Sequence, residues 1–397
     1  MAEKRIDRMN DEGKRTKERM PELEILRCLA MMMVVVLHFL DKGGYLGAMS
    51  EASMPGSRTL AWFLESFAIC AVNLYMLLSG YLLCETHFKI TRLLQLVLQV
   101  WMYSVGIGLL SVVLGLYPIS EVNLYFLLRL FFPISQSHYW FLTAYTFFYL
   151  LVPFLGIAVQ RLSAKALRLM IALFLLVFSV LKSIAPFQFD TDQKGYDCLW
   201  YICLFLTAVY IRKYGILWLR NARQGLCVYL ISCLAIFGVS MGIRAVYLQT
   251  GHLERNLTVC YHYNHFLVFL AAVGLFTAFL GFGGKTGLPG RICGRIGRYT
   301  LGVYLLHENL GIRTLWPGWF GAQQADTAGA LLVHLLTAVM IVFAAGIFTE
   351  FVRSSAVKGL HTGMMHLKPY RMLIQKLEAW DDLFEMRNEN ELKSKQQ

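Results

Sequence analysis

Long apolar runs recur along the whole chain and decide what it can fold into. A run of about 18 or more apolar residues is long enough to cross the hydrocarbon core of a bilayer as a helix. Ten such runs can be recognised in this chain. The sixth, at residues 198–211, and the ninth, at residues 299–316, are short or polar for full spans. The sequence predicts an all-α polytopic integral membrane protein with about ten transmembrane helices. The ten runs lie at residues 24–41, 60–83, 93–116, 138–156, 167–186, 198–211, 225–247, 264–282, 299–316 and 329–351.

Composition agrees with this fold class. Of the 397 residues, 57% are hydrophobic and only 16% are charged, whereas a soluble globular protein is nearer a quarter charged. The cysteines are scattered without metal-site spacing. Cys198 and Cys260 fall near outer helix ends, but we expect no disulfide between them. The sequence contains no complete phosphate-binding loop of the pattern GxxxxGK[ST], which argues against a primary pump.

Basic residues are distributed unevenly between the two sides of the predicted bundle. With the N-terminus inside, all but eight of the 37 basic residues fall on inner loops and terminal segments. Cytoplasmic loops of membrane proteins carry such an excess of lysine and arginine. We therefore expect both termini in the cytoplasm. The eight exceptions are Lys42, Arg58, Arg129, Lys182, Lys194, Arg244, Arg255 and Arg313.

This bias explains the net charge of +12 as a topology signal, with contact to anionic membrane lipid as a second role. It does not indicate binding to nucleic acid. We divide the chain into a basic cytoplasmic N-terminal segment (1–20), a membrane domain (21–353) and a cytoplasmic tail (354–397). Residues 121–134 are apolar but too short to span, so we expect an interfacial or re-entrant piece there. The long charged start argues against a cleaved signal peptide.

Two polar residues interrupt the first apolar run, "LRCLAMMMVVVLHFLDK". Arg27 and His38 are eleven residues apart, which is about 20° more than three helical turns and about 16 Å along the axis. Both side chains therefore share one helix face, and Glu24 lies three residues before Arg27 on that face. Arg27 is near the inner surface, and His38 is in the outer half of the span.

Each of these groups also has a structural interpretation. An arginine can anchor a helix at the inner surface, and a histidine can bond a neighbouring helix. The shared face of Glu24, Arg27 and His38 favours function, because ionisable groups inside a span are costly. A buried histidine can serve as a general base near neutral pH.

The second span ends in basic residues. Lys89 and Arg92 are spaced i, i+3 and could hold phosphates at the inner surface, but positive-inside charge alone also explains them. Within the span, Gly80 would permit close approach of another helix. The basic, glycine-rich stretch at 283–298 could contact a phosphate-bearing ligand through its arginines.

Two later segments carry further candidates. Tyr139 and Trp140 fit an interfacial aromatic belt, although sugar rings also pack on aromatic faces. The stretch "RYTLGVYLLHENLGIR" contains three adjacent polar residues, His307, Glu308 and Asn309. Tyr304 precedes His307 by three residues and lies on the same helix face. Such a cluster should face the protein interior or a cavity, as a site or as a structural network between helices.

Four of these features together resemble the membrane acyltransferase-3 family. Arg27, ten intervening residues and His38 resemble its first-span signature. "VNLYMLLSGYLL" is similar to its second-span motif, and "HYWFL" and "LGVYLLHENLGIR" are similar to its fourth-span and late-span motifs. The resemblance extends from about Glu22 to Arg353. It implies about ten helices and transfer of an acyl group to an extracytoplasmic glycan.

The resemblance carries over to individual residues. It implies that His38 is the essential catalytic histidine and that Arg27 is its partner, near the donor. Lys89 and Arg92 would lie near the phosphates of coenzyme A. We expect Trp140, together with the late-span residues Tyr304, His307 and Glu308, to contact substrate. No metal is expected.

The predicted function is therefore that of a membrane O-acyltransferase in the plasma membrane of a bacterium. It would transfer an acyl group, in the first instance acetyl from acetyl-CoA, to a hydroxyl of an extracytoplasmic or lipid-linked glycan. A transporter or flippase without acyl transfer is the alternative, because charged groups at depth serve that role equally well. A covalent acyl intermediate on His38 is the variant mechanism, in which His38 is a nucleophile instead of a base. The acceptor, the acyl group and a homodimeric assembly stay open.

Overall fold

The structure is a computed structural model, and it describes residues 20–84, 88–184, 193–216, 218–219, 221–284, 286–322 and 327–384. Except for Met20, the predicted N-terminal segment lies outside these residues, as do residues 385–397 of the predicted tail. Within the described ranges the regular elements are helices and no strand occurs. They are α2 (Pro21–Lys42), α3 (Gly56–Ala68), α4 (Ala71–Leu83), α5 (Ile90–Val113), α6 (Leu124–Phe131), α7 (Trp140–Arg161), α8 (Ala164–Leu175), α9 (Leu181–Ile184), α10 (Cys198–Tyr214), α11 (Ala222–Thr250), α12 (Phe266–Leu280), α13 (Gly287–Ile296), α14 (Thr300–His307), α15 (Trp316–Trp319), α16 (Ala328–Met364) and α17 (Lys368–Asp382).

Eight helical segments among the described residues are long and apolar enough to cross a membrane. This confirms the predicted all-α polytopic membrane fold. The sixth and ninth predicted runs are not among the eight. Helix α10 has 17 residues, and α14 has only eight. The predicted interfacial piece forms the short helix α6, whose first turn is capped by the Asn123 side chain, which accepts a hydrogen bond from the Phe126 N–H.

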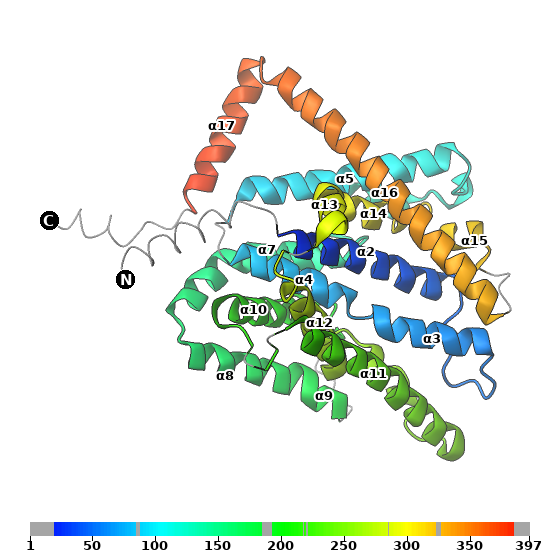
Figure 1. Ribbon diagram of the computed structural model, residues 1–397. Coiled ribbons are helices and arrows are strands. Elements are labelled where there is room, and N and C mark those ends of the chain that lie inside the picture. The colour runs from blue at the N-terminus through cyan, green and yellow to red at the C-terminus, as the bar shows by residue number, and fades with distance from the viewer. Residues whose placement is uncertain are drawn as a thin grey trace.

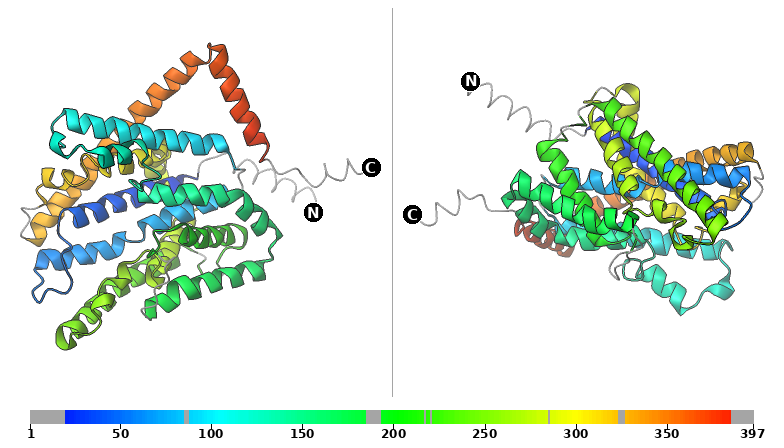
Figure 2. Two further views of the ribbon diagram at one scale, coloured as in Figure 1. Left: turned by 180° about the vertical axis from the view of Figure 1, so that it is seen from behind. Right: turned by 90° about the horizontal axis from the view of Figure 1, so that it is seen from below.

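Helix α2 runs through the middle of the bundle. It packs against α3, α4, α12, α13, α14 and α16, and in Figures 1 and 2 α5 and α11 lie on opposite flanks of it. This position explains the burial of most of its apolar residues, such as Leu26, Val35 and Phe39. A polar side chain on α2 therefore faces other helices, which is a condition for a site inside the bundle.

Close helix contacts depend on small residues, as predicted for Gly80. Helix α4 packs on α10, and a Cβ atom at Gly80 would lie 2.9 Å from the Ala208 Cβ and 3.1 Å from the Phe205 Cα. A larger residue at position 80 would push α10 away from α4. The prediction for Gly80 is confirmed.

The C-terminal helices return to the bundle. Helix α16 continues past residue 353, and α17 folds back from its end toward the start of α5 (Figure 1). The Asp381 carboxylate accepts hydrogen bonds from the Thr91 N–H and hydroxyl, and the Phe384 and Phe88 rings lie 4.8 Å apart. These contacts hold the end of α17 beside the start of α5.

Candidate active site

The predicted shared face of α2 leads into two adjoining cavities. His38 lines a small one of about 50 Å³ toward the Lys42 end of α2, and Arg27 lines a larger one of about 350 Å³ toward the Pro21 end. After the predicted topology, they are called the outer and the inner cavity. The two cavities share three wall residues, Tyr75, Phe141 and Leu301. Helical periodicity therefore places one polar group of α2 in each of two neighbouring chambers.

The inner cavity is cationic. Arg27, Arg92 and Arg298 all line it, and Arg27 is held by two 3.0 Å hydrogen bonds to the Glu24 carboxylate. Arg298 belongs to the basic glycine-rich stretch singled out above. Lys89 does not line this cavity, although its backbone lies against Tyr149, which does. Three guanidinium groups around one space suit a ligand with several phosphates.

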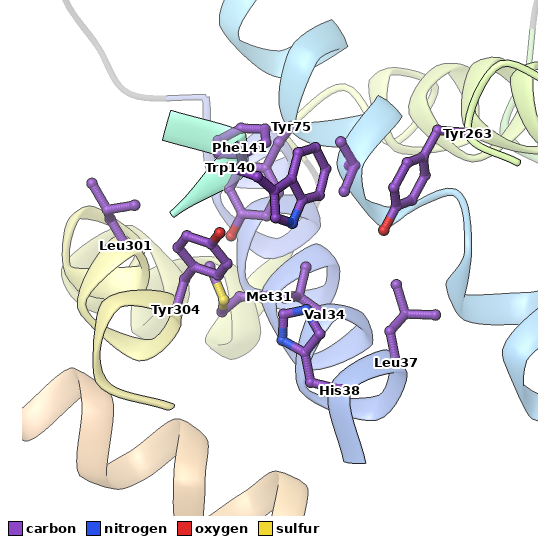
Figure 3. Close-up of a pocket in the computed structure, with 11 residues that line it drawn as sticks. Met31, Val34, Leu37, His38, Tyr75, Trp140, Phe141, Tyr263, Leu301 and Tyr304 are labelled. Carbon is purple, nitrogen blue, oxygen red and sulfur yellow. The ribbon is translucent and has the colours of Figure 1, made fainter. Parts of the chain in front are cut away.

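The outer cavity is lined by aromatic and aliphatic side chains around His38. Trp140, Phe141, Tyr263 and Tyr304 line this cavity together with His38 (Figure 3). The ring centroids of His38 and Tyr304 are 6.2 Å apart, and Trp140 stacks on Tyr263 at 5.7 Å. Trp140 is thus a wall of this chamber. The aromatic-belt interpretation of Tyr139 is wrong, because this side chain is only 1% exposed and its hydroxyl donates to the Leu305 carbonyl.

His38 is hydrogen-bonded to a second histidine. Its Nδ1 lies 2.8 Å from Nε2 of His307, at the end of α14. The Nδ1 atom of His307 is in turn 2.6 Å from the Val303 carbonyl oxygen. A carbonyl oxygen only accepts, so in neutral His307 the Nδ1 atom carries the proton and Nε2 must accept.

This chain of bonds fixes the tautomer of His38. Since Nε2 of His307 accepts, His38 donates from Nδ1, and its Nε2 keeps a free lone pair. The nitrogen with the lone pair is the one turned away from His307. His38 is therefore held in the form that can accept a proton from a molecule in its cavity.

A carboxylate and an ammonium group complete this cluster. Glu308 Oε1 is 3.3 Å from the Nδ1 atom of His38, and the same oxygen forms an ion pair with the Lys42 ammonium. The carboxylate is a second acceptor at Nδ1 of His38, so it favours the same tautomer. Lys42 balances the charge of Glu308, which would otherwise be a buried unpaired anion.

The chain beyond α14 is irregular, and the Asn309 side chain supports it with hydrogen bonds. The Asn309 side-chain amide donates to the Tyr103 carbonyl at 2.9 Å, and its oxygen accepts from the Gly311 N–H at 3.0 Å. Non-helical backbone is tolerated at membrane depth only where it is buried in protein. Asn309 thus lets α14 end at His307, and the ninth predicted run is no continuous helix.

His138 also forms a hydrogen bond with the segment that follows α14. Its Nε2 accepts from the Leu310 N–H at 3.1 Å, so Nδ1 carries the proton and donates to the Ser104 hydroxyl, also at 3.1 Å. Ser104 donates to the Leu130 carbonyl. His138 therefore fixes the position of the chain next to Glu308.

Comparison with protein families matches residues 20–349 to the acyltransferase-3 family, described as an acyltransferase domain. The match covers most of the chain. The chain belongs to the acyltransferase-3 family. The protein is thus a membrane acyltransferase, as the four sequence motifs predicted. Comparison with curated proteins and with solved structures gave no significant match.

In this acyltransferase, sequence reasoning missed Lys42 as a member of the His38 cluster. Lys42 was counted only as one of eight basic residues outside the inner surface. The spacing could have indicated this role, because Lys42 follows His38 by four residues and so lies on the same helix face. Its partner Glu308 is far away in the sequence, and no local pattern pairs the two.

The cluster of the acyltransferase also has the composition of a metal site. The ligand atoms of His38, His307 and Glu308 all lie within 4.8 Å of one another, a donor set that zinc accepts. Both ring nitrogens that would bind an ion are used in one hydrogen bond, and the Lys42 ammonium occupies the carboxylate. The arrangement fits a hydrogen-bonded cluster better than a bound metal ion, and the absence of a metal stays a prediction.

Proposed function

We propose that this acyltransferase transfers an acetyl group from cytoplasmic acetyl-CoA to a hydroxyl of an extracytoplasmic or lipid-linked glycan, with His38 as the general base. The observation that carries the proposal is the hydrogen bond between Nδ1 of His38 and Nε2 of His307. It leaves Nε2 of His38 as a proton acceptor in a cavity that adjoins a cationic chamber.

The cavities support a donor path from the inner side. The phosphates of coenzyme A would bind Arg27, Arg92 and Arg298, since guanidinium groups pair with phosphate through two parallel hydrogen bonds. The thin pantetheine arm would pass between Tyr75 and Phe141, which line both cavities. Its thioester would then reach the His38 chamber, whose volume of about 50 Å³ favours a short acyl group.

The chemical step follows from the tautomer of His38. Its Nε2 removes the proton of the acceptor hydroxyl, and the hydroxyl oxygen attacks the thioester carbonyl carbon. The tetrahedral intermediate collapses with cleavage of the carbon–sulfur bond, and the imidazolium returns the proton to the coenzyme A thiolate. His307 and Glu308 stabilise the imidazolium as acceptors at Nδ1. Both His307 nitrogens are used in this network, so Tyr304 is the better candidate donor to the oxyanion.

The deciding experiment uses the purified protein in proteoliposomes with acetyl-CoA and an extract of cell-envelope glycans. We expect release of coenzyme A together with an acetyl mass increase on the glycan, both dependent on the protein. Movement of substrate across the membrane with no loss of acetyl-CoA would support a transporter and contradict the proposal. Mass analysis of envelope glycans from cells with and without the protein would identify the acceptor.

Removing a cationic wall of the inner cavity should weaken donor binding. For Arg92→Gln we expect the KM for acetyl-CoA to rise about ten- to a hundredfold, the usual worth of a charge-assisted hydrogen bond, with little change in kcat. Arg161→Gln is the matched control, because Arg161 is an exposed arginine at the end of α7 and does not line the cavity. An unchanged KM in Arg92→Gln would contradict the assignment of this chamber to the donor.

A further inference from the structure

Two arginines meet at the outer end of the bundle. Arg129 on α6 and Arg313, in the segment between α14 and α15, line a cavity of about 300 Å³. Both are among the eight basic residues that the charge bias leaves outside the inner surface. Arginines are disfavoured on outer loops, so a pair of them around one outer cavity needs a reason.

Neither arginine has a carboxylate partner among the residues that the structure describes. Arg27, Arg58 and Arg353 each form an ion pair with a glutamate, whereas Arg129 and Arg313 form none. The Nε atom of Arg129 is buried without a hydrogen-bond partner, and its guanidinium lies 5.6 Å from the centre of the Tyr125 ring.

The two charges act on each other without compensation. Burial, and after it the Arg313 charge, lower the pKa of Arg129. Glu121, the acidic residue nearest to Arg129 in sequence, is exposed and interacts with the Tyr117 hydroxyl. Glu308, the one nearest to Arg313, forms its ion pair with Lys42. Like charges held together at a partly buried place are costly unless an anion joins them.

The remaining walls of the cavity are hydrogen-bond donors or neutral groups. Asn123 uses its side-chain oxygen to cap α6, which leaves its amide N–H groups available. The hydroxyls of Tyr125 and Thr314 can also donate. A donor-rich pocket with two guanidinium groups matches a phosphate group, whose oxygens only accept when it is ionised.

The pocket is connected to the reaction centre. Leu310, which lies two residues after Glu308, is one of its walls. The Leu310 N–H donates a hydrogen bond to Nε2 of His138. The Arg313 N–H donates to the Asn309 carbonyl at 2.8 Å, which holds Arg313 one turn beyond the His307–Glu308 pair. The Arg313 charge is close enough to interact with His38 and Lys42.

We propose that Arg129 and Arg313 bind a phosphate group of the acceptor, so that the acceptor is a glycan that carries a phosphodiester or pyrophosphate. This rests on the proposed function, because it assumes that the acceptor arrives from the outer side. The bound phosphate would anchor the acceptor at the outer end of the bundle while one of its hydroxyls reaches His38.

Binding can be tested without any transfer activity. With the purified protein in uncharged detergent, we expect inorganic pyrophosphate to raise the melting temperature by a few degrees. The shift should fall in the Arg129→Gln/Arg313→Gln variant, by the part that the outer site contributes, and persist in full in Arg255→Gln, another outer arginine. Arg129→Lys/Arg313→Lys should retain part of it, which guards against a glutamine variant that fails to fold.

The inner arginines could bind pyrophosphate too, so a second variant separates the two sites. Arg92→Gln/Arg298→Gln should keep the part of the shift that depends on Arg129 and Arg313. If Arg129→Gln/Arg313→Gln retains the full shift while Arg92→Gln/Arg298→Gln loses it, the outer site does not exist. This measurement stands even if acetyl transfer is never detected.

Two further measurements distinguish an acceptor phosphate from a phospholipid headgroup. In the transfer assay, Arg129→Gln/Arg313→Gln should raise the KM for a phosphate-bearing glycan about tenfold or more and leave the KM for acetyl-CoA unchanged. Adding phosphatidylglycerol to the micelles should leave the pyrophosphate shift intact. If phosphatidylglycerol abolishes the shift and the acceptor KM is unaffected, the pocket is a lipid site and the proposal is wrong.

Discussion

Acyl transfer should fall about a hundredfold to ten-thousandfold in His38→Gln, the usual contribution of a positioned general base. Glutamine nearly preserves the volume, and its amide N–H can still donate to Nε2 of His307, so the packing of α2 against α14 is kept. It offers no group that can take a proton at neutral pH. The measurement is kcat for acetyl transfer in proteoliposomes, with the melting temperature and gel-filtration profile as evidence of folding.

His334→Gln is the matched control for this prediction. His334 lies on α16, where its Nδ1 is 2.9 Å from the Gly321 carbonyl, and it does not line either cavity of the site. It should leave kcat unchanged. If a folded His38→Gln protein kept substantial activity, His38 would be neither the base nor a nucleophile.

Loss of the His307 acceptor should give the second large effect. In His307→Phe, Nδ1 of His38 loses its 2.8 Å partner, and only the carboxylate of Glu308 at 3.3 Å remains. The ring of His38 can then rotate or change tautomer. We expect kcat to fall about ten- to a hundredfold, the loss found when the partner that orients a metal-binding histidine is removed.

His307 is assigned as a positioning residue, and the conservative variant tests that role. In His307→Gln the amide oxygen can accept from His38 while the amide N–H donates to the Val303 carbonyl, so part of the activity should return. The KM for acetyl-CoA should stay near the wild-type value in both variants, because His307 does not line the donor cavity. Equal losses in His307→Phe and His307→Gln would indicate a purely structural role.

Much of the membrane fold could be predicted because the signal is local. Each span is a continuous apolar run, and the two runs that looked short or polar are those that do not form long helices. The ninth run failed for a reason that only contacts reveal. His138 and Asn309 bond the backbone beyond His307, so the helix can end inside the protein.

The site was predicted in part. Periodicity placed Arg27 and His38 on one face of α2, and Trp140 and Tyr304 do line the His38 chamber. Lys89 does not line the inner chamber, which Arg298 lines instead. Lysine at a span end is expected from the charge bias in any membrane protein, so its presence did not indicate where its side chain would lie.

The sequence by itself determined the fold class, the family and the polar face of α2, because hydropathy and the helical repeat act within one run of residues. The tertiary structure decided which groups meet across helices. His307, the partner of His38, is 269 positions away. Arg129 and Arg313 also come from distant segments of the chain and line one cavity. Such contacts depend on how whole helices pack against one another. The spacing of residues within one helix does not determine that packing.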